Sequence, residues 1–140
     1  MQSQTHTGAC HCKSVQFRVH LLDGLKMASR CSCSFCAMRG AVALTAPLDG
    51  LEFIQGEELL TLYRFNTKVA KHYFCSKCGI YTHHQRRANP NEYGINAACL
   101  EGLSPFDFEE IKVTDGVNHP SDNTSLPPVA GVLRFIKDGA

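Results

Sequence analysis

The sequence predicts a small, mainly β protein that is organised around two metal sites. Short runs of alternating apolar and polar residues recur along the 140 residues, and turn signals separate them. No helical pattern of ten residues or more is present. Eight cysteines gather mainly in three short motifs, which is more cysteine than packing alone requires.

Length and composition favour one folded domain over residues 1–140. Hydrophobic residues are 44% of the chain and charged residues 19%, which excludes a disordered chain. No linker is long enough to divide two domains. The polar N-terminus lacks the pattern of a signal peptide, and no apolar run approaches the roughly 18 residues of a membrane span. We therefore expect a cytoplasmic protein that does not bind membranes.

Cysteine usage and charge narrow the function further. In the cytosol, eight cysteines indicate metal ligands or reactive thiols rather than disulfides. The formal charge is +1, and seven thiolates with two Zn²⁺ ions would change it to about −2. Such a chain has no basic surface for nucleic acid.

The first third of the chain is predicted to be two strands and a helical turn. Val15, Phe17 and Val19 alternate with polar residues, the period of a half-buried strand that begins near residues 8–12. Within a strand, Cys10 and Cys12 would point to the same face. After a turn at 23–24, a short strand over 27–29 leads to Cys31.

The helical turn follows at once, and strands make up the remainder. Ser34 is predicted to cap a turn that runs through Met38 and ends at Gly40. Asn66-Thr67-Lys68 would join two strands as a hairpin, and residues 126–128 are rich in proline. The predicted strands span residues 41–45, 51–54, 60–65, 69–74, 80–84, 93–97 and 132–136.

The motif Cys75-Ser76-Lys77-Cys78-Gly79 is predicted to be a zinc knuckle. Its tight turn would present both sulfurs to one ion, and Gly79 would supply a positive φ. The pair could also be a redox dithiol, but redox pairs usually open a helix. β-prone sequence on both sides favours zinc.

The knuckle needs two further ligands. Cys10 and Cys12 would complete a closed set of four thiolates with Cys75 and Cys78. The run Cys31-Ser32-Cys33-Ser34-Phe35-Cys36 would then hold a second ion with one open position, which is typical of catalytic zinc. Spacing leaves other pairings open, such as Cys99 completing this loop. The alternative for Cys99 is a small buried residue of the core.

These cysteine motifs resemble those of a known family. Gly-x-Cys-x-Cys at 8–12, Cys-x-Cys-x-x-Cys at 31–36 and Phe-Cys-x-x-Cys-Gly at 74–79 are similar to the glutathione-dependent formaldehyde-activating enzymes, a family that also includes centromere protein V. The resemblance covers about residues 8–99, with residues 100–140 as a C-terminal extension.

The resemblance implies a β-tent fold of packed antiparallel sheets. It implies a structural zinc on Cys10, Cys12, Cys75 and Cys78, and a catalytic zinc on a second set of ligands, Cys31, Cys33 and Cys36. The family reaction joins glutathione to formaldehyde and forms S-(hydroxymethyl)glutathione. A small thiol and a small aldehyde are therefore the expected substrates.

The open position suggests how such a site would act. A metal-bound thiol is deprotonated at neutral pH, and the thiolate can attack an aldehyde carbon. The metal could instead polarise the carbonyl oxygen. Three thiolates already leave the site with net negative charge, which weakens its Lewis acidity and favours activation of the thiol.

Several polar residues carry weaker hypotheses. His83 and His84 are adjacent in a predicted strand, so one of them should face inward. A structural, hydrogen-bonded histidine is the simpler interpretation, and a proton relay is the alternative. Arg86 and Arg87 could hold a substrate carboxylate, although a solvated loop is the simpler interpretation. The remaining hypotheses are ligand contacts at Asp115 and His119 and a hydrophobic plug at Phe35.

We interpret the chain as a carbon–sulfur lyase-type enzyme that acts on thiol–aldehyde adducts. The first alternative is a non-catalytic zinc scaffold or binding module of the same fold, in which a protein group fills the open position. The second is a redox protein that uses Cys75 and Cys78 as a reversible disulfide.

Overall fold

Strands dominate the computed structural model, which describes residues 4–22, 24–26, 28–65, 70–86, 89–116 and 129–139. Within these ranges helix is confined to α1 (Ser34–Arg39) and to short 3-10 turns over Leu48–Gly50, Glu57–Leu59, Ala97–Cys99 and Pro105–Asp107. The strands are β1 (Gln4–Ala9), β2 (Gln16–Leu21), β3 (Ser29–Cys31), β4 (Ala43–Pro47), β5 (Leu51–Gln55), β6 (Leu60–Tyr63), β7 (Lys71–Cys75), β8 (Tyr81–Gln85), β9 (Glu92–Asn96), β10 (Glu110–Thr114) and β11 (Val129–Arg134). The prediction of a small, mainly β domain is confirmed.

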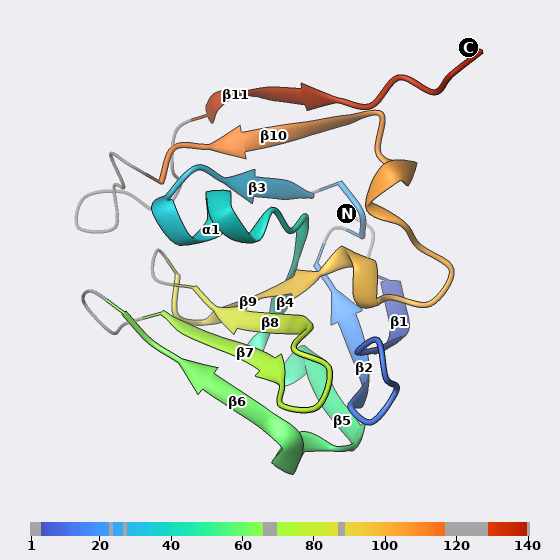
Figure 1. Ribbon diagram of the computed structural model, residues 1–140, viewed down its shortest axis with the longest axis vertical. Helices are drawn as coiled ribbons and strands as arrows, with labels where there is room; N and C mark the ends of the chain where they lie inside the picture. The colour runs from blue at the N-terminus through green and yellow to red at the C-terminus, as the bar shows by residue number, and fades with distance from the viewer. Residues whose placement is uncertain are drawn as a thin grey trace.

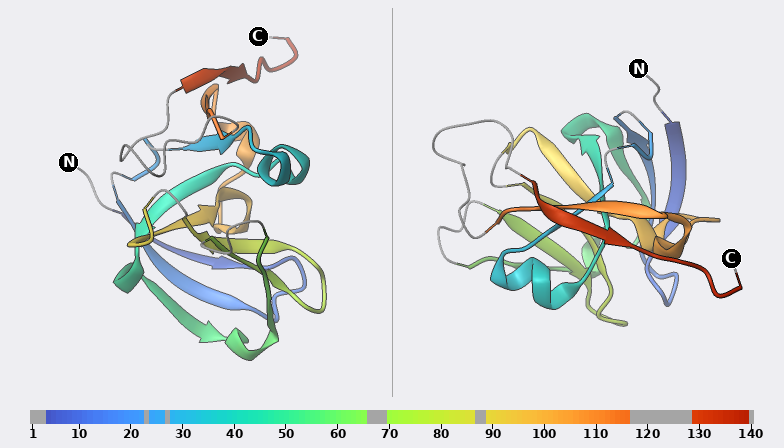
Figure 2. Two further views of the ribbon diagram at one scale, coloured as in Figure 1. Left: turned by 90° about the vertical axis from the view of Figure 1, so that its left-hand side faces the viewer. Right: turned by 90° about the horizontal axis from the view of Figure 1, so that it is seen from above.

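The strands form two sheets that share a core (Figure 1). The smaller sheet has the order β1-β2-β5, and the larger has the order β11-β10-β3-β4-β9-β8-β7-β6. Among the described strands, every pairing is antiparallel except that of β3 with β10, which is parallel. Figure 2 shows β11 at the outer edge of the molecule, with β10 between it and β3.

The polar N-terminal segment forms β1, which the sequence analysis did not predict. It pairs with β2 from Gln4↔Leu21 to Ala9↔Gln16. Cys10 and Cys12 therefore lie in the turn between these strands rather than in a strand, and the expectation of a strand over 8–12 holds only to Ala9. The turn closes through Cys10 N–H donating to Val15 O at 3.1 Å, with Lys13 at φ 68°.

The short helix α1 forms where the sequence predicts it, but its cap differs. Cys33 is the N-cap, and its sulfur accepts from the Cys36 N–H, whereas Ser34 is already helical. Gly40 ends the helix at φ 72°, a conformation that glycine adopts at no steric cost, and its N–H donates to Cys36 O. The helix is therefore held between a cysteine and a glycine.

Strand pairing agrees with the prediction for β6 and β7 and differs from it at β10. β6 and β7 pair antiparallel as predicted, with Leu60 opposite Cys75. The hairpin at 66–68 and the proline-rich residues 126–128 lie outside the described residues. Strand β10 was not predicted from the sequence. Its parallel pairing with β3 places Thr114 beside Cys31, and the carbonyl oxygen of Thr114 accepts from Ser32 N–H at 3.0 Å.

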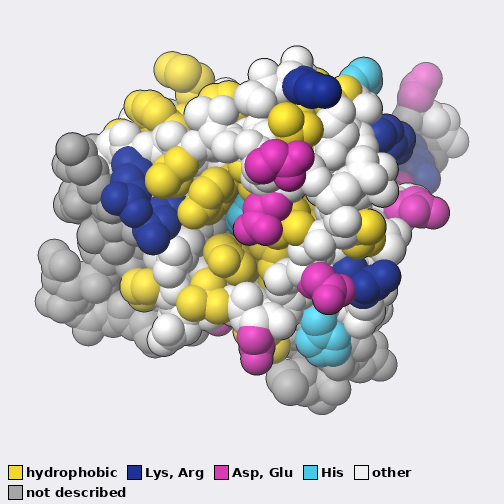
Figure 3. Space-filling model, turned by 90° about the horizontal axis from the view of Figure 1, so that it is seen from below, with side chains coloured by type: hydrophobic (Ala, Val, Ile, Leu, Met, Phe, Trp, Pro, Cys, Tyr) yellow, Lys and Arg dark blue, Asp and Glu magenta, His cyan; other side chains and the backbone are white. Residues whose placement is uncertain are grey.

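The core lies between the two sheets. Its fully buried residues come from β2, β4 and β9 and include Phe17, Val19, Leu21, Leu44, Ala46 and Ile95. A second, smaller cluster contains Cys10, Val15 and Cys75. On the face seen in Figure 3, hydrophobic side chains lie between acidic and basic ones. Within the described ranges, no helix is long and apolar enough to cross a membrane.

Candidate metal centres and the adjoining cavity

Four cysteines from two distant parts of the chain converge on one point. Cys10 and Cys12 come from the β1–β2 turn, Cys75 is the last residue of β7, and Cys78 lies in the turn that follows it. Their sulfurs all lie within 4.8 Å of one another. The Sγ–Sγ distances are 3.6 Å for Cys10 and Cys12 and 3.8 Å for Cys12 and Cys75.

The second turn has the predicted knuckle geometry. Gly79 has φ 77°, and its N–H donates to Cys75 O at 2.8 Å. Lys77 N–H points at Cys75 Sγ at 3.4 Å, and Val15 N–H points at Cys10 Sγ at the same distance. Backbone N–H groups directed at sulfur stabilise thiolates.

A second cluster contains Cys31, Cys33 and Cys36, whose sulfurs also lie within 4.8 Å of one another. Cys31 ends β3, while Cys33 and Cys36 belong to the first turn of α1. Hydrogen bonds with the thiols of Cys31 and Cys36 lower the pKa of Cys33 to about 2. Those with Cys31 and Cys33 raise the pKa of Cys36. Negative charge at the cluster is therefore favoured on Cys33, where the neighbouring thiols stabilise it.

The chain after β10 lies against this cluster. Gly116 N–H donates to Ser32 Oγ at 3.0 Å, and a Cβ on Gly116 would overlap with Cys31 Sγ and the backbone of Cys33. Only glycine fits at this position without displacing the cysteines. Asp115 directly precedes it, whereas His119 lies outside the described residues.

Both clusters fit zinc by their donor atoms and spacing. Zn–S bonds of about 2.3 Å in a tetrahedron separate sulfurs by about 3.8 Å, and the first cluster has this spacing. A disulfide would need a much shorter separation, and all eight cysteines are free thiols. The first cluster offers four sulfurs and the second offers three. Among the described residues, no further cysteine, histidine or acidic side chain belongs to the second cluster.

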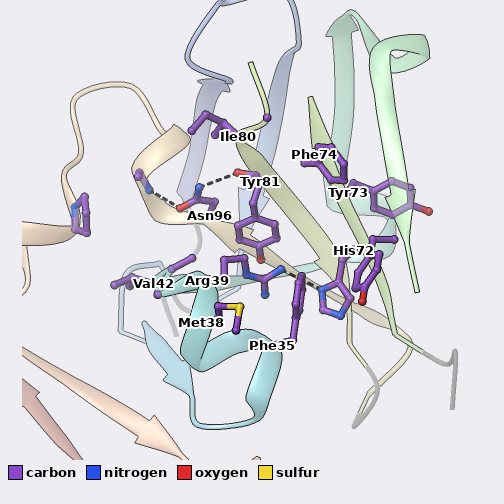
Figure 4. Close-up of a pocket in the computed structure, with 16 residues that line it drawn as sticks. Phe35, Met38, Arg39, Val42, His72, Tyr73, Phe74, Ile80, Tyr81 and Asn96 are labelled. Atoms are coloured by element: carbon purple, nitrogen blue, oxygen red, sulfur yellow. Dashed lines mark hydrogen bonds between the residues drawn. The ribbon is translucent and has the colours of Figure 1, made fainter. Parts of the chain in front are cut away.

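Beside the second cluster is a cavity of about 610 Å³ between α1 and the strands β7 and β8 (Figure 4). The Arg39 guanidinium is in its wall, 3.7 Å from the Tyr81 ring centroid and 4.7 Å from that of Phe35. It donates to His72 Nδ1 at 3.1 Å and to Cys36 Sγ at 3.5 Å. Arg39 Nε is buried without a hydrogen-bond partner.

A β-bulge in β8 places Tyr81, which lines the cavity, on the same face of the strand as His84. The register shifts between Tyr73 and Phe74, so that Tyr81 pairs with Phe74 while His84 pairs with His72. Tyr81 and His84, three positions apart, therefore lie on one face. The Tyr81 hydroxyl and His84 Nδ1 are 2.6 Å apart, and the His84 ring stacks on His72 with centroids 5.0 Å apart.

Sequence analysis missed Arg39 and His72. Arg39 stands three residues after Cys36, one helical turn on, and this spacing was the available signal. Nothing local marks His72, because its place depends on the pairing of β7 with β8.

A family comparison connects these clusters with known proteins. A model of the family described as glutathione-dependent formaldehyde-activating enzyme matches residues 5–112. The chain belongs to this family. Membership supports glutathione-dependent formaldehyde activation as the general activity. The matched range includes all seven cysteines of the two clusters and ends within β10.

A solved structure supports the fold of this family member. The crystal structure of a Rhodobacter sphaeroides protein, from Northeast Structural Genomics, is similar with a TM-score of 0.76. The two sequences are 56% identical, and the match covers 77% of this chain and 99% of that chain.

The other predicted residues of this family member have varied surroundings. Both histidines of β8 are covered, on opposite faces: His83 is 3% exposed, and His84 is partly buried against Tyr81 and His72. Thr82 hydrogen-bonds to His83, and the His83 ring stacks on Tyr73 with ring centroids 4.6 Å apart, so a structural role fits His83.

The expectation of a solvated Arg86 is wrong, because this partly buried side chain donates to Thr45 Oγ1 at 2.9 Å.

Three residues remain. Arg87 lies outside the described residues. Cys99 is 8% exposed and donates to Tyr81 O at 3.5 Å, apart from both clusters, so it belongs to the core. Phe35 packs against the Tyr63 and Phe65 rings and also lines the cavity. It is therefore both a hydrophobic contact and a cavity wall.

Proposed function

We propose that this protein is a zinc-dependent carbon–sulfur lyase-type enzyme that acts on thiol–aldehyde adducts. The reaction of its family is formation of S-(hydroxymethyl)glutathione from glutathione and formaldehyde. The observation that carries the proposal is the cluster of Cys31, Cys33 and Cys36, which offers three sulfurs to a metal beside a cavity. Because these ligands need a reducing environment, we place the protein in the cytoplasm.

The two clusters take different roles in this proposal. Cys10, Cys12, Cys75 and Cys78 would hold a structural zinc that joins the N-terminal turn to the knuckle. The three-cysteine cluster would hold the second zinc, which when bound supplies charge that keeps a thiol substrate deprotonated. Two ions per chain are therefore expected.

The reaction itself needs little rearrangement. A bond forms between the thiol sulfur and the aldehyde carbon, the π pair of the carbonyl moves to its oxygen, and that oxygen takes up the proton that the thiol loses. The reverse reaction cleaves the carbon–sulfur bond and restores thiol and aldehyde. No oxidant or reductant is consumed.

Arg39 supports this chemistry from the side of the cavity. Its guanidinium donates to Cys36 Sγ at 3.5 Å, so positive charge would lie next to the three thiolates of a zinc-loaded cluster. A substrate thiolate would add a further negative charge at the cluster. The nearby guanidinium reduces the electrostatic cost of that charge.

A non-catalytic zinc scaffold of the same fold is the alternative. The packing of Gly116 favours the scaffold, because the backbone of this residue lies directly against Cys31 and Cys33 and covers one side of the cluster. In the scaffold, added thiols would change neither metal binding nor the rate of any aldehyde reaction.

Thiol-dependent exchange of formaldehyde, followed by magnetisation-exchange NMR, decides between the two. The zinc-loaded protein should exceed the spontaneous rate, and Cys33→Ser should remove the excess. Cys99→Ala is the matched control, because it removes a cysteine outside both clusters. If the intact protein never exceeds the spontaneous rate with any small thiol, the scaffold is the better proposal.

A further inference from the structure

We propose that the cavity between α1 and strands β7 and β8 binds the organic part of the thiol substrate, and that this part is an aromatic or branched-alkyl monocarboxylate. The identification of the ligand as a thiol rests on the proposed function, whereas the carboxylate site stands on the cavity alone. At about 610 Å³, the cavity is large enough for a small aromatic acid.

The walls of the cavity are largely apolar. They include Phe35, Met38, Val42, Tyr63, Phe74, Ile80, Tyr81 and Pro105. Two of the polar groups present are already engaged within the protein. Asn96 donates to Tyr81 O at 2.8 Å and accepts from Ala98 N–H at 3.1 Å, and the Tyr81 hydroxyl bonds to His84 and to Gly94 O. Such walls favour an apolar ligand body.

Among the described residues of the wall, Arg39 supplies the one full charge. A guanidinium has five N–H donors, and the hydrogen bonds of Arg39 go to His72 Nδ1 and Cys36 Sγ. The ion pairs among the described residues are Arg18–Glu52 and Arg134–Glu110, so no carboxylate of the described chain pairs with Arg39. Its ring contacts with Tyr81 and Phe35 hold it at the cavity. This guanidinium therefore has donors left for a carboxylate.

His72 adds a second donor. Because Arg39 can only donate, His72 Nδ1 must accept, and the proton of the neutral ring is then on Nε2. His72 is 4% exposed and is part of the cavity wall. A cationic fork with a neighbouring N–H is complementary to a carboxylate.

The same walls are poorly matched to glutathione. Glutathione carries an ammonium group, more than one carboxylate and peptide groups, all of which need polar partners when buried. Among the described residues, the lining contains neither Asp nor Glu to pair with an ammonium group. A monocarboxylate with an apolar body matches the single guanidinium and the aromatic walls. Arg39 also contacts Cys36 Sγ, so a thiol close to the bound carboxylate would lie near the three-cysteine cluster.

Binding of 3-phenylpropanoate to the zinc-loaded protein, followed by NMR titration, tests the site without any thiol or aldehyde. The neutral 3-phenylpropionamide is the matched ligand. We expect the acid to bind about tenfold more tightly than the amide, because a charge-assisted pair with Arg39 is lost in the amide. Arg39→Gln should remove this preference, and Arg18→Gln, at an exposed arginine, should keep it. Equal binding of acid and amide would overturn the proposal.

A second pair of variants avoids any loss of packing. Met38 lines the cavity yet is 89% exposed, so the fold tolerates charge there. Met38→Glu should weaken binding of 3-phenylpropanoate severalfold, and Met38→Lys should strengthen or preserve it. Binding of the amide should change little in either variant. The same affinity for the acid in both variants would place the ligand elsewhere.

Formaldehyde exchange with 2-mercapto-3-phenylpropanoate and with glutathione then links the site to turnover. We expect the aromatic thiol to give the higher kcat/KM. If glutathione supports exchange but 3-phenylpropanoate does not bind, the cavity proposal fails and the proposed function stands. If 3-phenylpropanoate binds through Arg39 but no thiol supports exchange, the proposed function fails and the carboxylate site stands.

Discussion

Arg39 Nη2 lies 3.5 Å from Cys36 Sγ, so a cation on α1 contacts a sulfur of the three-cysteine cluster. Through Nη1 the same guanidinium bonds to His72 on β7, another residue of the cavity wall. One side chain thereby joins the candidate metal centre to the candidate ligand site. This contact allows the charge of Arg39 to be tested at the metal independently of turnover.

Arg39→Gln should weaken zinc binding at the three-cysteine cluster. Removing the cation makes it easier to protonate the thiolates, and protons compete with the metal. Loss of a hydrogen-bond partner of a metal ligand typically costs about 10- to 100-fold in affinity. Competition with a chromophoric chelator measures the change, and Arg18→Gln is the control because it removes an exposed arginine. Equal affinity in wild type and Arg39→Gln would show that this contact does not affect the metal.

Cys75→Ser should cost far more stability than Cys33→Ser. The four-cysteine cluster joins the N-terminal turn to the knuckle, and metal binding there is part of the folding free energy, roughly 10 kcal/mol or more. Cys33 belongs to a cluster within residues 31–36, which closes only a short loop. Thermal melts of both variants, with metal content measured, provide the comparison. Equal losses would mean that the roles of the two clusters are assigned wrongly.

A mild chelator should remove one zinc ion and leave the fold intact. The three-cysteine cluster offers one ligand fewer than the four-cysteine cluster, so it should release its ion first. Circular dichroism would follow the fold while released zinc is counted, and formaldehyde exchange should fall and then return with one added equivalent. A half-depleted protein that keeps its original rate would exclude this cluster as the catalytic centre.

Gly116→Ala should disturb the three-cysteine cluster although residue 116 carries no ligand. The added Cβ would overlap with Cys31 Sγ and with Cys33, so the sulfurs must move apart. We expect weaker zinc binding there and little change at the four-cysteine cluster. Gly131→Ala is the matched control, because a Cβ there meets no atom within 4 Å. Zinc titration of the two variants measures the difference, and similar affinities would argue against the packing described.

Acid should destabilise the fold partly through His83. Burial lowers the pKa of His83 to about 4, below its usual 6.5, so the folded state prefers the neutral ring. The resulting stability is present above pH 6.5 and is lost as the pH falls towards 4, on the order of 3 kcal/mol. In His83→Phe, stability should fall less between these pH values.

Urea titrations at a series of pH values would test this difference. Both proteins keep the same cysteines, so acid-induced loss of metal affects both and cancels in the comparison. Parallel pH profiles for wild type and His83→Phe would contradict a buried neutral His83.

The sequence by itself determined the features that depend on a few adjacent residues. The knuckle at 75–79 follows from cysteine spacing and the positive φ of Gly79, and α1 ends at Gly40 for the same conformational reason. Alternation of apolar residues located most strands, because burial of one face imposes a period of two. The grouping of three cysteines over 31–36 was also local, although metal binding by either cluster stays a prediction.

The tertiary structure decided what strand pairing brings together. Pairing of β1 with β2 places Cys10 and Cys12 in a turn beside the knuckle, and parallel pairing of β10 with β3 brings Gly116 against Cys31. The bulge in β8 and the contact of Arg39 with His72 likewise depend on register. Register is set by the packing of residues far apart in the chain, and a one-residue shift changes which face a side chain occupies. No local pattern contains that information, so the cavity and the contact of Arg39 with His72 emerged only from the fold.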